Sequence, residues 1–513
     1  MGASSTGRAT RPGVVLAILS GALALISLDN TILNVALPSL QEDLNATTSQ
    51  LQWVIDAYSV VFAGTLLLAG VLGDRFGRRR LLLVGLIIFG IGSLAAGLSW
   101  DVQVLTACRA FMGIGAACIM PSTLSILTQV FVDPHQRVRA IGTWAAVSGA
   151  AIAVGPILGG VLLEISTWHA VFLINPPLAL IVGLLTLRFI PESADPARPR
   201  IDVLGAILST AGVVAFIVTV IQLPEAGIDA VTVTSAIAAV VLLLGFVLWE
   251  RRAANPLLPM SLFSNRVFTV SAVCVGLVYF ALMGMMFFLP QFLQLVQDLS
   301  PLEAGFATMP GALALLVGSL ISPRLSDRWG SRRVLVLGLS VVALGLLALG
   351  LVTRSAPYIL VGLPFTLIGL GLGFALPQAT NGILASVPRE RSGLGSAIND
   401  GFAELGGSIG VALLGAILSA GYRGAIEQAI AAAGSAIDTI PATVVEACRE
   451  SLAAAVIAIG QLPQSLSQPI EAVAGSAFVT GMGTALWVGA ALVVVGVVLA
   501  RVLLPRTMER ASE

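Results

Sequence analysis

Long apolar stretches recur through this 513-residue chain and limit what it can fold into. A helix needs roughly 20 consecutive apolar residues to cross the hydrocarbon layer of a membrane. Only 11% of the residues are charged, against about 25% in soluble proteins, so most of the surface must face lipid. We therefore predict an all-α membrane protein. Its fourteen predicted spans lie at about 14–38, 52–72, 81–99, 102–130, 139–163, 168–189, 203–223, 231–249, 267–295, 304–323, 334–352, 358–384, 393–419 and 476–504.

Arginine placement gives these spans an orientation. All 27 basic residues are arginine. If the N-terminus is cytoplasmic, 23 of them fall in cytoplasmic segments, Arg109 lies within a span, and only Arg354, Arg423 and Arg449 fall outside. Positive charge collects on the cytoplasmic side of membrane proteins. The distribution therefore predicts a multi-pass protein of the cytoplasmic (inner) membrane with both termini in the cytoplasm.

One charged phrase occurs twice, each time in a short gap between two spans. It reads Gly-Asp-Arg-Phe-Gly-Arg-Arg-Arg at 73–80 and Ser-Asp-Arg-Trp-Gly-Ser-Arg-Arg at 326–333. A repeat of this kind indicates two related bundles. The copies are eight spans apart rather than six, so two extra spans must separate the halves. We predict an N-terminal six-helix bundle at 1–189, linkers with two inserted helices at 190–266, and a C-terminal six-helix bundle at 267–513.

One predicted extracytoplasmic segment, 420–475, is unusually long. Its Ala-rich pieces at 424–433 and 441–460 are typical of short amphipathic helices, and Pro463 and Pro469 are expected to split the helical structure of this segment. The segment fits a passive surface hairpin as well as a lid over an outer vestibule.

Five ionisable residues lie within predicted spans, where an ionised side chain costs at least about 2.5–3.5 kcal/mol. They are Asp29, Asp56, Arg109, Asp400 and Glu404. Helix rise puts Asp29 roughly 13 Å and Arg109 roughly 10 Å below the outer face. We therefore expect these two to pair. The pair either couples proton movement to transport or is a static contact that orients the helices.

Asp400 and Glu404 are four residues apart and share one helix face. Such a pair could attract a lipophilic cation and exchange it for protons, or it could be a hydrogen-bonded structural pair. Asp56 lies nearer the outer surface and fits an interfacial carboxylate or a cation-attracting site. Charged residues at span ends and both histidines are expected to be solvated or interfacial: Glu164, Asp298, Glu303, His135 and His169.

Four motifs, in order, resemble those of the major facilitator superfamily, in particular its fourteen-span drug:proton antiporters of the quaternary-ammonium and multidrug type. The first is the turn Gly-x-x-x-Asp-Arg-x-Gly-Arg-Arg at 70–79, and the others are Leu28–Pro38 in span 1, Arg109–Gly115 in span 4 and Gly149–Gly160 in span 5. The resemblance covers nearly the whole chain. It implies two six-helix bundles that rock around a central cavity.

The repeated turn is expected to act as a conformational latch that favours the outward-facing state. A salt bridge between Asp74 and Arg78 could form in one conformer and break in the other, and glycines permit the tight turn. In the second copy Ser326 and Ser331 replace glycine and arginine, which predicts a weaker latch. The predicted latch residues are Gly73, Asp74, Arg75, Gly77, Arg78, Arg79, Asp327, Arg328 and Gly330.

Span 5 carries Gly155, Pro156, Gly159 and Gly160. Gly155 and Gly159 have the spacing of closely packed membrane helices, and Pro156 removes one backbone hydrogen bond and can kink the helix. In terms of the resemblance this interface would restrict leak, although packing alone also accounts for it.

These features favour a proton-coupled secondary transporter that exports lipophilic cationic drugs from the cytoplasm by alternating access. The alternatives are an antiporter of the same fold dedicated to one endogenous metabolite or antibiotic, and an uncoupled lipid or solute facilitator. No nucleotide-binding loop, nucleophile constellation or metal-ligand spacing appears in the sequence, so we expect no enzyme activity, cofactor, metal or nucleic-acid partner. The expected partners are small lipophilic cations, protons and the bilayer, with the chain acting as a monomer.

Overall fold

The computed structural model of the protein describes residues 11–44, 46, 48–196, 201–227, 229–433, 440–460 and 462–505. These residues form helices joined by short turns, and they include no strand. Thirteen helices are long and apolar enough to cross a membrane, and a bent helix supplies a fourteenth. The predicted all-α membrane fold is therefore confirmed. Five of the arginines assigned to cytoplasmic segments lie outside the described residues: Arg8, Arg198, Arg200, Arg506 and Arg510.

The first bundle comprises seven helices that share one hydrophobic core. Within it α2 packs on α4, α3 packs on α4 and α7, and α1 packs on α5. The predicted span at 168–189 is two helices that break at Ile174. The helices are α1 (Pro12–Leu44), α2 (Thr48–Phe76), α3 (Arg78–Ala96), α4 (Val102–Val130), α5 (Pro134–Ile165), α6 (His169–Leu173) and α7 (Asn175–Phe189).

The second bundle has its own core. Its helix α11 packs on α13, α12 packs on α13 and α17, and α10 packs on α14. Its elements are α10 (Arg266–Gln291), the π-helical turn η2 (Phe292–Val296), α11 (Pro301–Trp329), α12 (Ser331–Leu349), α13 (Ile359–Ser386), η3 (Arg389–Arg391), α14 (Ser392–Ala433), α15 (Ala442–Glu450), α16 (Leu452–Ile459) and α17 (Gln464–Leu503).

Two helices, α8 (Val203–Ala226) and α9 (Ala230–Glu250), stand between the bundles in the chain. Asp202 and Asp229 accept hydrogen bonds from the first turns of these helices, which fixes where each begins. α8 packs on α2 and also contacts α14, whereas α9 packs on α8. Most of the α9 surface is apolar and exposed, as expected for a helix that faces lipid. A short 3₁₀ helix, η1 (Met260–Ser264), precedes α10.

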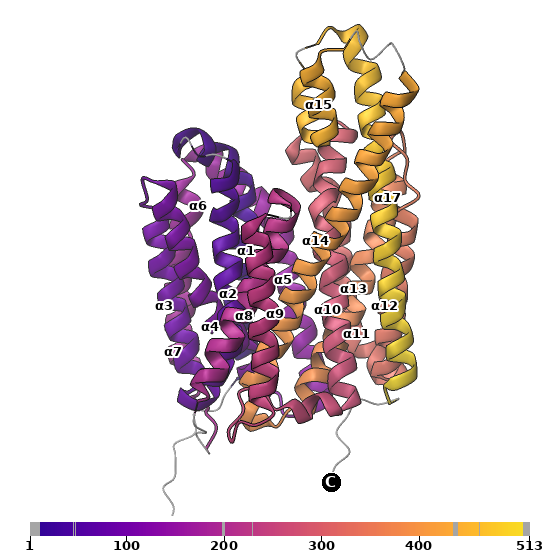
Figure 1. Cartoon of the computed structure of the whole chain (residues 1–513). Helices are drawn as coiled ribbons and strands as arrows, with labels where there is room; N and C mark the ends of the chain where they lie inside the picture. The colour runs from indigo at the N-terminus through magenta and orange to yellow at the C-terminus, as the bar shows by residue number, and fades with distance from the viewer. Residues whose placement is uncertain are drawn as a thin grey trace, which may run out of the picture.

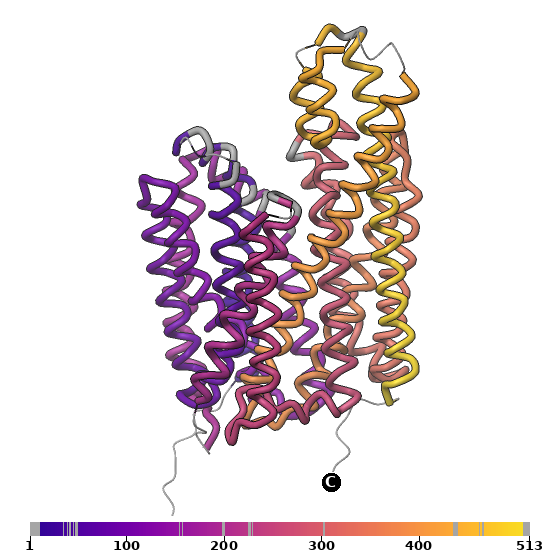
Figure 2. The backbone as a smooth tube through the Cα atoms, viewed as in Figure 1, coloured from indigo at the N-terminus to yellow at the C-terminus, as the bar shows by residue number. Residues whose placement is uncertain are grey.

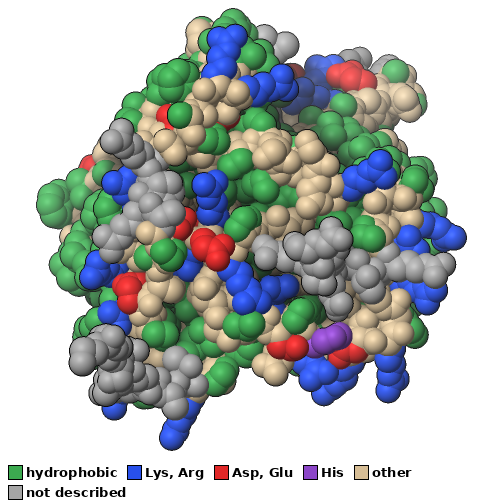
Figure 3. Space-filling model, turned by 90° about the horizontal axis from the view of Figure 1, so that it is seen from below, with side chains coloured by type: hydrophobic (Ala, Val, Ile, Leu, Met, Phe, Trp, Pro, Cys, Tyr) green, Lys and Arg blue, Asp and Glu red, His purple; other side chains and the backbone are tan. Residues whose placement is uncertain are grey.

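The two bundles lie close together at one end of the molecule and draw apart towards the other (Figure 1). We call these the lower and upper ends, as in Figure 1. The end of α17 lies at the lower end. Arg332 of the second repeated turn donates a 3.1 Å hydrogen bond to the Leu504 carbonyl, so that turn is at the lower end as well. Arginine side chains are spread over this face (Figure 3).

The long predicted segment at 420–475 is more helical than expected. α14 runs unbroken through 42 residues to Ala433, and α17 begins at Gln464 and runs for 40 residues. Pro463 precedes α17, but Pro469 lies inside it, so the prediction of a break at Pro469 is wrong. The two long helices project beyond their neighbours and carry α15 and α16 at the upper end (Figure 2).

Candidate functional site

A buried ion pair joins α1 to α4 inside the first bundle. Arg109 Nη1 lies 2.6 Å from Asp29 Oδ2, and both side chains are only 1% exposed. Burying either charge alone would be costly, and the opposite charge offsets that cost. The structure thus places in direct contact two residues that sequence analysis put at similar depth.

The second carboxylate oxygen of Asp29 also has a partner, which the sequence did not reveal. Asn175 Nδ2, at the start of α7, donates to Asp29 Oδ1 at 2.8 Å and lies 3.0 Å from the hydroxyl oxygen of Ser93. Ser93 in turn donates to the carbonyl oxygen of Phe172 at 2.8 Å. Both polar side chains are buried. The Asp29 carboxylate is therefore held from three helices, α3, α4 and α7, directly or through one intermediate side chain.

The Arg109 guanidinium is held by α2. Its Nε donates to the Val54 carbonyl oxygen at 3.2 Å, and its Cζ lies 4.4 Å from the centre of the Tyr58 ring. The cation–π contact and the hydrogen bond fix the guanidinium plane. Asp56 lies between these two contact residues on α2, and its side chain is half-buried.

A second acidic pair lies on α14 of the other bundle. Asp400 is buried and Glu404 is half-buried, and their spacing puts both on one face. Asn399 donates to Asp400 Oδ1 at 3.0 Å, while Asp400 Oδ2 has no hydrogen-bond partner among the described residues. No salt bridge to either carboxylate is found in the described part of the chain. Their charge can therefore be balanced by a proton or by a cationic ligand.

Tyr58 lies within electrostatic range of acidic residues from both bundles. Glu404 is close enough to Tyr58 to act on it electrostatically, as Asp29 and Arg109 also do. Asp400 and Glu404 both act in the same way on Tyr279 of α10. Tyr58 is therefore influenced both by the ion pair of the first bundle and by Glu404 of the second.

The first repeated turn joins the two bundles at the lower end. Asp74 Oδ1 lies 2.7 Å from Arg78 Nη2, and both side chains are almost fully buried. Arg78 also donates to the carbonyl oxygens of Arg389 and Glu390 at 3.2 and 2.6 Å. Asp74 accepts hydrogen bonds from the backbone of Gly393 at 2.8 Å and Leu394 at 3.0 Å.

This geometry uses the first turn of α14 as an anion site. The free N–H groups of a helix N-terminus and its dipole favour a carboxylate. Close approach requires small residues, because a Cβ at Gly70 would lie 2.5 Å from the Gly393 carbonyl oxygen. Gly73 is buried beside Leu81 and lies one residue before Asp74.

The second turn repeats the arrangement with different donors. Asp327 Oδ1 lies 2.6 Å from His135 Nδ1, and Asp327 Oδ2 lies 2.8 Å from Arg139 Nη2. Both donors are on α5, whose own N-terminus is already capped by Asp133. The His135 side chain is 57% exposed, which fits the expected interfacial position, and it also belongs to a contact between the bundles that was not expected. Arg328 is exposed, with no partner found among the described residues.

The loop after α7 packs against the first turn. The amide nitrogen of Arg78 donates to the Ser193 carbonyl oxygen at 2.9 Å, and that of Asp195 donates to the Asp74 carbonyl oxygen at 2.6 Å. Glu192 accepts from the Arg79 amide at 3.1 Å. Gly77 has a φ of 113°, and Gly330 in the second turn has a φ of 84°, conformations that favour glycine. Arg75 contacts the Phe76 ring.

The glycines of α5 have different surroundings. Gly155 and Gly159 pack on α1, against Thr31 and Ile32 respectively, whereas a Cβ at Gly160 would meet nothing within 4 Å. The halves Pro134–Ile152 and Ile157–Ile165 are bent by 42°. Pro156 lies at this bend, and its side chain is outside the described part of the structure.

Four residues of these sites are not singled out by the sequence: Asn175, Ser93, Tyr58 and His135. Asn175 could have been noticed, because it is a polar side chain before two prolines in an otherwise apolar run. The other three look like ordinary span or span-end residues. Only the three-dimensional contacts separate them from their neighbours.

Comparisons with known proteins agree with this architecture. Residues 19–411 match the family model described as Major Facilitator Superfamily. Multidrug efflux pump LfrA of Mycolicibacterium smegmatis is 35% identical over 97% of this chain and 98% of its own length. Puromycin resistance protein pur8 of Streptomyces alboniger is 37% identical over 78% of this chain and 81% of its own length.

A solved structure supports the fold alone. The crystal structure of the human organic anion transporter MFSD10 (TETRAN) superposes with a TM-score of 0.63 at 15% identity, covering 96% of this chain and 99% of that one. The family prediction is confirmed by the match of 19–411 and by the full-length relative. The chain therefore belongs to the major facilitator superfamily, and it is a membrane transporter rather than an enzyme.

Proposed function

We propose that this protein exports lipophilic organic cations from the cytoplasm in exchange for protons. The observation that carries the proposal is the Asp29–Arg109 pair, a titratable carboxylate buried in a membrane bundle at 2.6 Å from its counter-charge. Relatives named as a multidrug efflux pump and a puromycin resistance protein support drugs as the cargo. We further propose that a single chain suffices, because it carries both bundles.

The proposal assigns the lower end to the cytoplasm. Arginines concentrate in the segments at that end, as in cytoplasmic segments of other membrane proteins. The contacts of Asp74 with α14 and of Asp327 with α5 join the bundles there. With this orientation the structure is closed towards the cytoplasm, and the two turns act as latches of the outward-facing state.

Exchange then follows from competition for the same carboxylates. From outside, a proton neutralises Asp29 or the Asp400–Glu404 pair and weakens the hold of Arg109. The bundles rock, the latches break, and the site opens to the cytoplasm. A cationic substrate binds there by balancing the negative carboxylate charge that the proton had neutralised, and the proton leaves inwards. A proton and a cationic substrate thus compete for the same carboxylates, which couples the two movements.

Everted membrane vesicles test this proposal. Respiration acidifies their interior, and added ethidium should be pumped inwards while protons leave, so that a pH-sensitive dye reports alkalinisation. Asp29→Asn should abolish the response at equal protein content. Ethidium accumulation that is insensitive to the pH gradient, with no proton release, would instead support an uncoupled facilitator.

A second candidate is export of one dedicated metabolite or antibiotic. The similarity to Puromycin resistance protein pur8 favours it. A growth-inhibition panel in a host deleted for its own pumps separates the two candidates. Resistance to several unrelated cations supports multidrug export, whereas resistance confined to one compound supports a dedicated exporter.

A further inference from the structure

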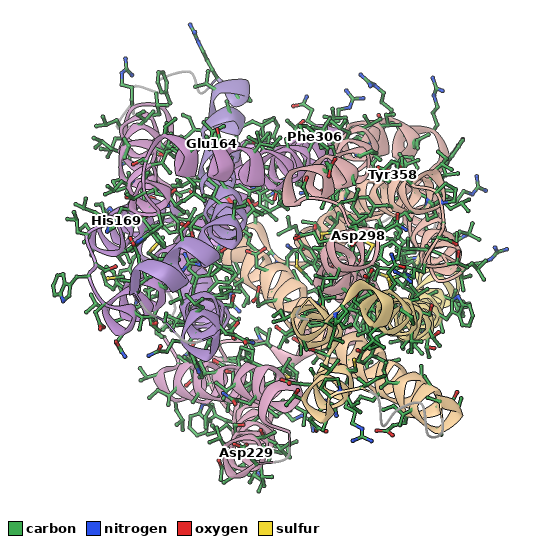
Figure 4. The ribbon with its side chains drawn as sticks, turned by 90° about the horizontal axis from the view of Figure 1, so that it is seen from above. Glu164, His169, Asp229, Asp298, Phe306 and Tyr358 are labelled. Carbon is green, nitrogen blue, oxygen red and sulfur yellow. The ribbon has the colours of Figure 1, made fainter. Side chains whose placement is uncertain are left out.

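A cavity at the upper end lies apart from the two acidic sites described above. Its volume is about 410 Å³, within the range of small-molecule sites. It is formed between η2 and the segment that follows it, the helix α16 and the start of α17. Figure 4 shows Asp298, one of its lining residues, on the upper face of the second bundle.

The backbone next to this cavity is irregular. α10 ends in the π-helical turn η2, and Asp298 follows with a φ of 54°. The Gln297 side chain donates to the carbonyl oxygens of Arg354 and Ala356 at 3.1 and 3.2 Å, which anchors the segment to the loop after α12. π-helical turns and positive-φ residues other than glycine cost stability and concentrate at functional sites. Here they present the Asp298 side chain at the cavity.

The charges in the cavity leave one carboxylate unbalanced. Glu471 is paired with Arg354, whose Nη2 lies 3.0 Å from Glu471 Oε1. Asp298 is exposed, and no hydrogen bond or ion pair of its carboxylate is found among the described residues. The expectation that Asp298 is simply solvated therefore leaves out its place beside a cavity.

The remaining wall is of mixed character. Leu295, Val456, Ile459 and Leu462 give it an apolar part, and Gln294 and Ser467 give it a polar part. Ile459 is buried. Within the described residues, no group of three or more His, Cys, Asp or Glu side chains is placed to hold a metal ion. A single negative charge beside a cluster of apolar side chains matches a flat organic monocation, whose charge meets the carboxylate while its body covers those side chains.

We infer that the cavity is an outer binding site for lipophilic organic monocations, separate from the Asp29 and Glu404 region. The inference rests on the proposed function for its ligand class. It adds a second site on the release side of the membrane, formed jointly by η2, the segment that follows it and the helices that project above the second bundle.

The test uses the full-length chain in lipid nanodiscs, with Cys448→Ala and Val456→Cys as a reporter in the cavity wall. A neutral maleimide modifies the reporter thiol, and the chain without the reporter provides the blank. Ethidium should slow reporter modification several-fold. The added substitution Asp298→Asn should remove this protection, and Leu295→Asn should weaken it.

Two controls locate the effect. Glu450→Gln, a carboxylate of the same projecting part that does not line the cavity, should leave the protection intact. Asp29→Asn should leave it intact as well, because that substitution acts on the ion pair of the first bundle. The inference would be overturned if ethidium protected the reporter equally with Asp298 and with Asn at that position. It would also be overturned if ethidium gave no protection in the reporter chain that retains Asp298. Failure of proton release in vesicles would instead count against the proposed function, since reporter protection requires no transport.

Discussion

The Nδ2 atom of Asn175 lies 2.8 Å from Oδ1 of Asp29, the carboxylate oxygen that Arg109 does not reach. Asn175 therefore gives a donor to the second oxygen of a carboxylate that is proposed to carry protons. A hydrogen bond to a charged group contributes about 1.5–3 kcal/mol. In the proposed cycle the Asn175 side chain holds Asp29 in position both when Asp29 is ionised and when it is protonated.

We predict that Asn175→Ala lowers ethidium-driven proton release about tenfold or more, because the Asp29 carboxylate loses a donor that fixes its position. The measurement is dye dequenching in everted vesicles. Thr186→Val on the same helix is the matched control, since the buried Thr186 hydroxyl has no hydrogen-bond partner in the described structure. An Asn175→Ala protein with unchanged proton release would remove Asn175 from the coupling mechanism.

The first latch should matter more than the second. Asp74→Asn breaks a buried ion pair, a change that costs about 3–5 kcal/mol, and it weakens the contact with the N-terminus of α14. Asp327→Asn should cost much less, because the side chains of Asp327, His135 and Arg139 are 29%, 57% and 59% exposed and solvent screens their charges.

Spin labels on Arg80→Cys and Arg333→Cys, after replacement of the native cysteines, report the separation of the lower ends. Electron–electron resonance should give a broader, longer distance distribution for Asp74→Asn and a small change for Asp327→Asn. Asp101→Asn, which alters a helix cap within one bundle, is the control. Equal shifts for both latch variants would contradict the ranking.

Much of the fold could be predicted because bilayer thickness sets the length of each apolar run. The predicted span at 203–223 coincides with the observed Val203–Leu223. The helix expected at 424–433 is the end of α14, but its unbroken continuation from the preceding span could not be predicted, since an Ala-rich segment fits a separate short helix as well as an extension of a longer one. Composition does not distinguish these outcomes; packing against α17 decides between them.

The residues of the candidate site could likewise be predicted only in part. Asp29 and Arg109 stand out because charge is rare in apolar spans, and helix rise alone puts them at one depth. The roles of Asn175 and His135 depend on which helices meet, and spacing along one helix carries no such information. Asp327 was expected from the repeat, but its partners on α5 were not.

Glu404→Gln should discriminate between substrates. Glu404 is half-buried on α14, with no salt bridge found among the described residues, so a cationic substrate can supply its counter-charge. We expect transport of monovalent cations to fall at least about tenfold, as the loss of one close charge interaction implies, while neutral drugs are retained. Initial efflux rates from loaded cells measure both kinds of transport.

The control is Glu164→Gln, at the exposed end of α5 (Figure 4), which should leave the efflux of cations and of neutral drugs unchanged. Full retention of cation efflux in Glu404→Gln would exclude a role of Glu404 in cation binding.

Two glycines five residues apart on α5 should respond in opposite ways to the same substitution. A Cβ at Gly155 would collide with the Thr31 side chain, whereas one at Gly160 would meet nothing within 4 Å. Gly155→Ala should therefore push α5 away from α1. Overpacking of this kind lowers the free energy of unfolding by about 1–3 kcal/mol. Gly160→Ala should be neutral or slightly stabilising, because alanine restricts the unfolded chain more than glycine does. Thermal unfolding of both variants in detergent, with efflux measured in parallel, tests the difference. If Gly155→Ala is as stable as the parent protein but leaks protons in vesicles, the α1–α5 contact acts as a seal against proton leak. If both variants behave like the parent protein, the close contact at Gly155 contributes neither to stability nor to such a seal.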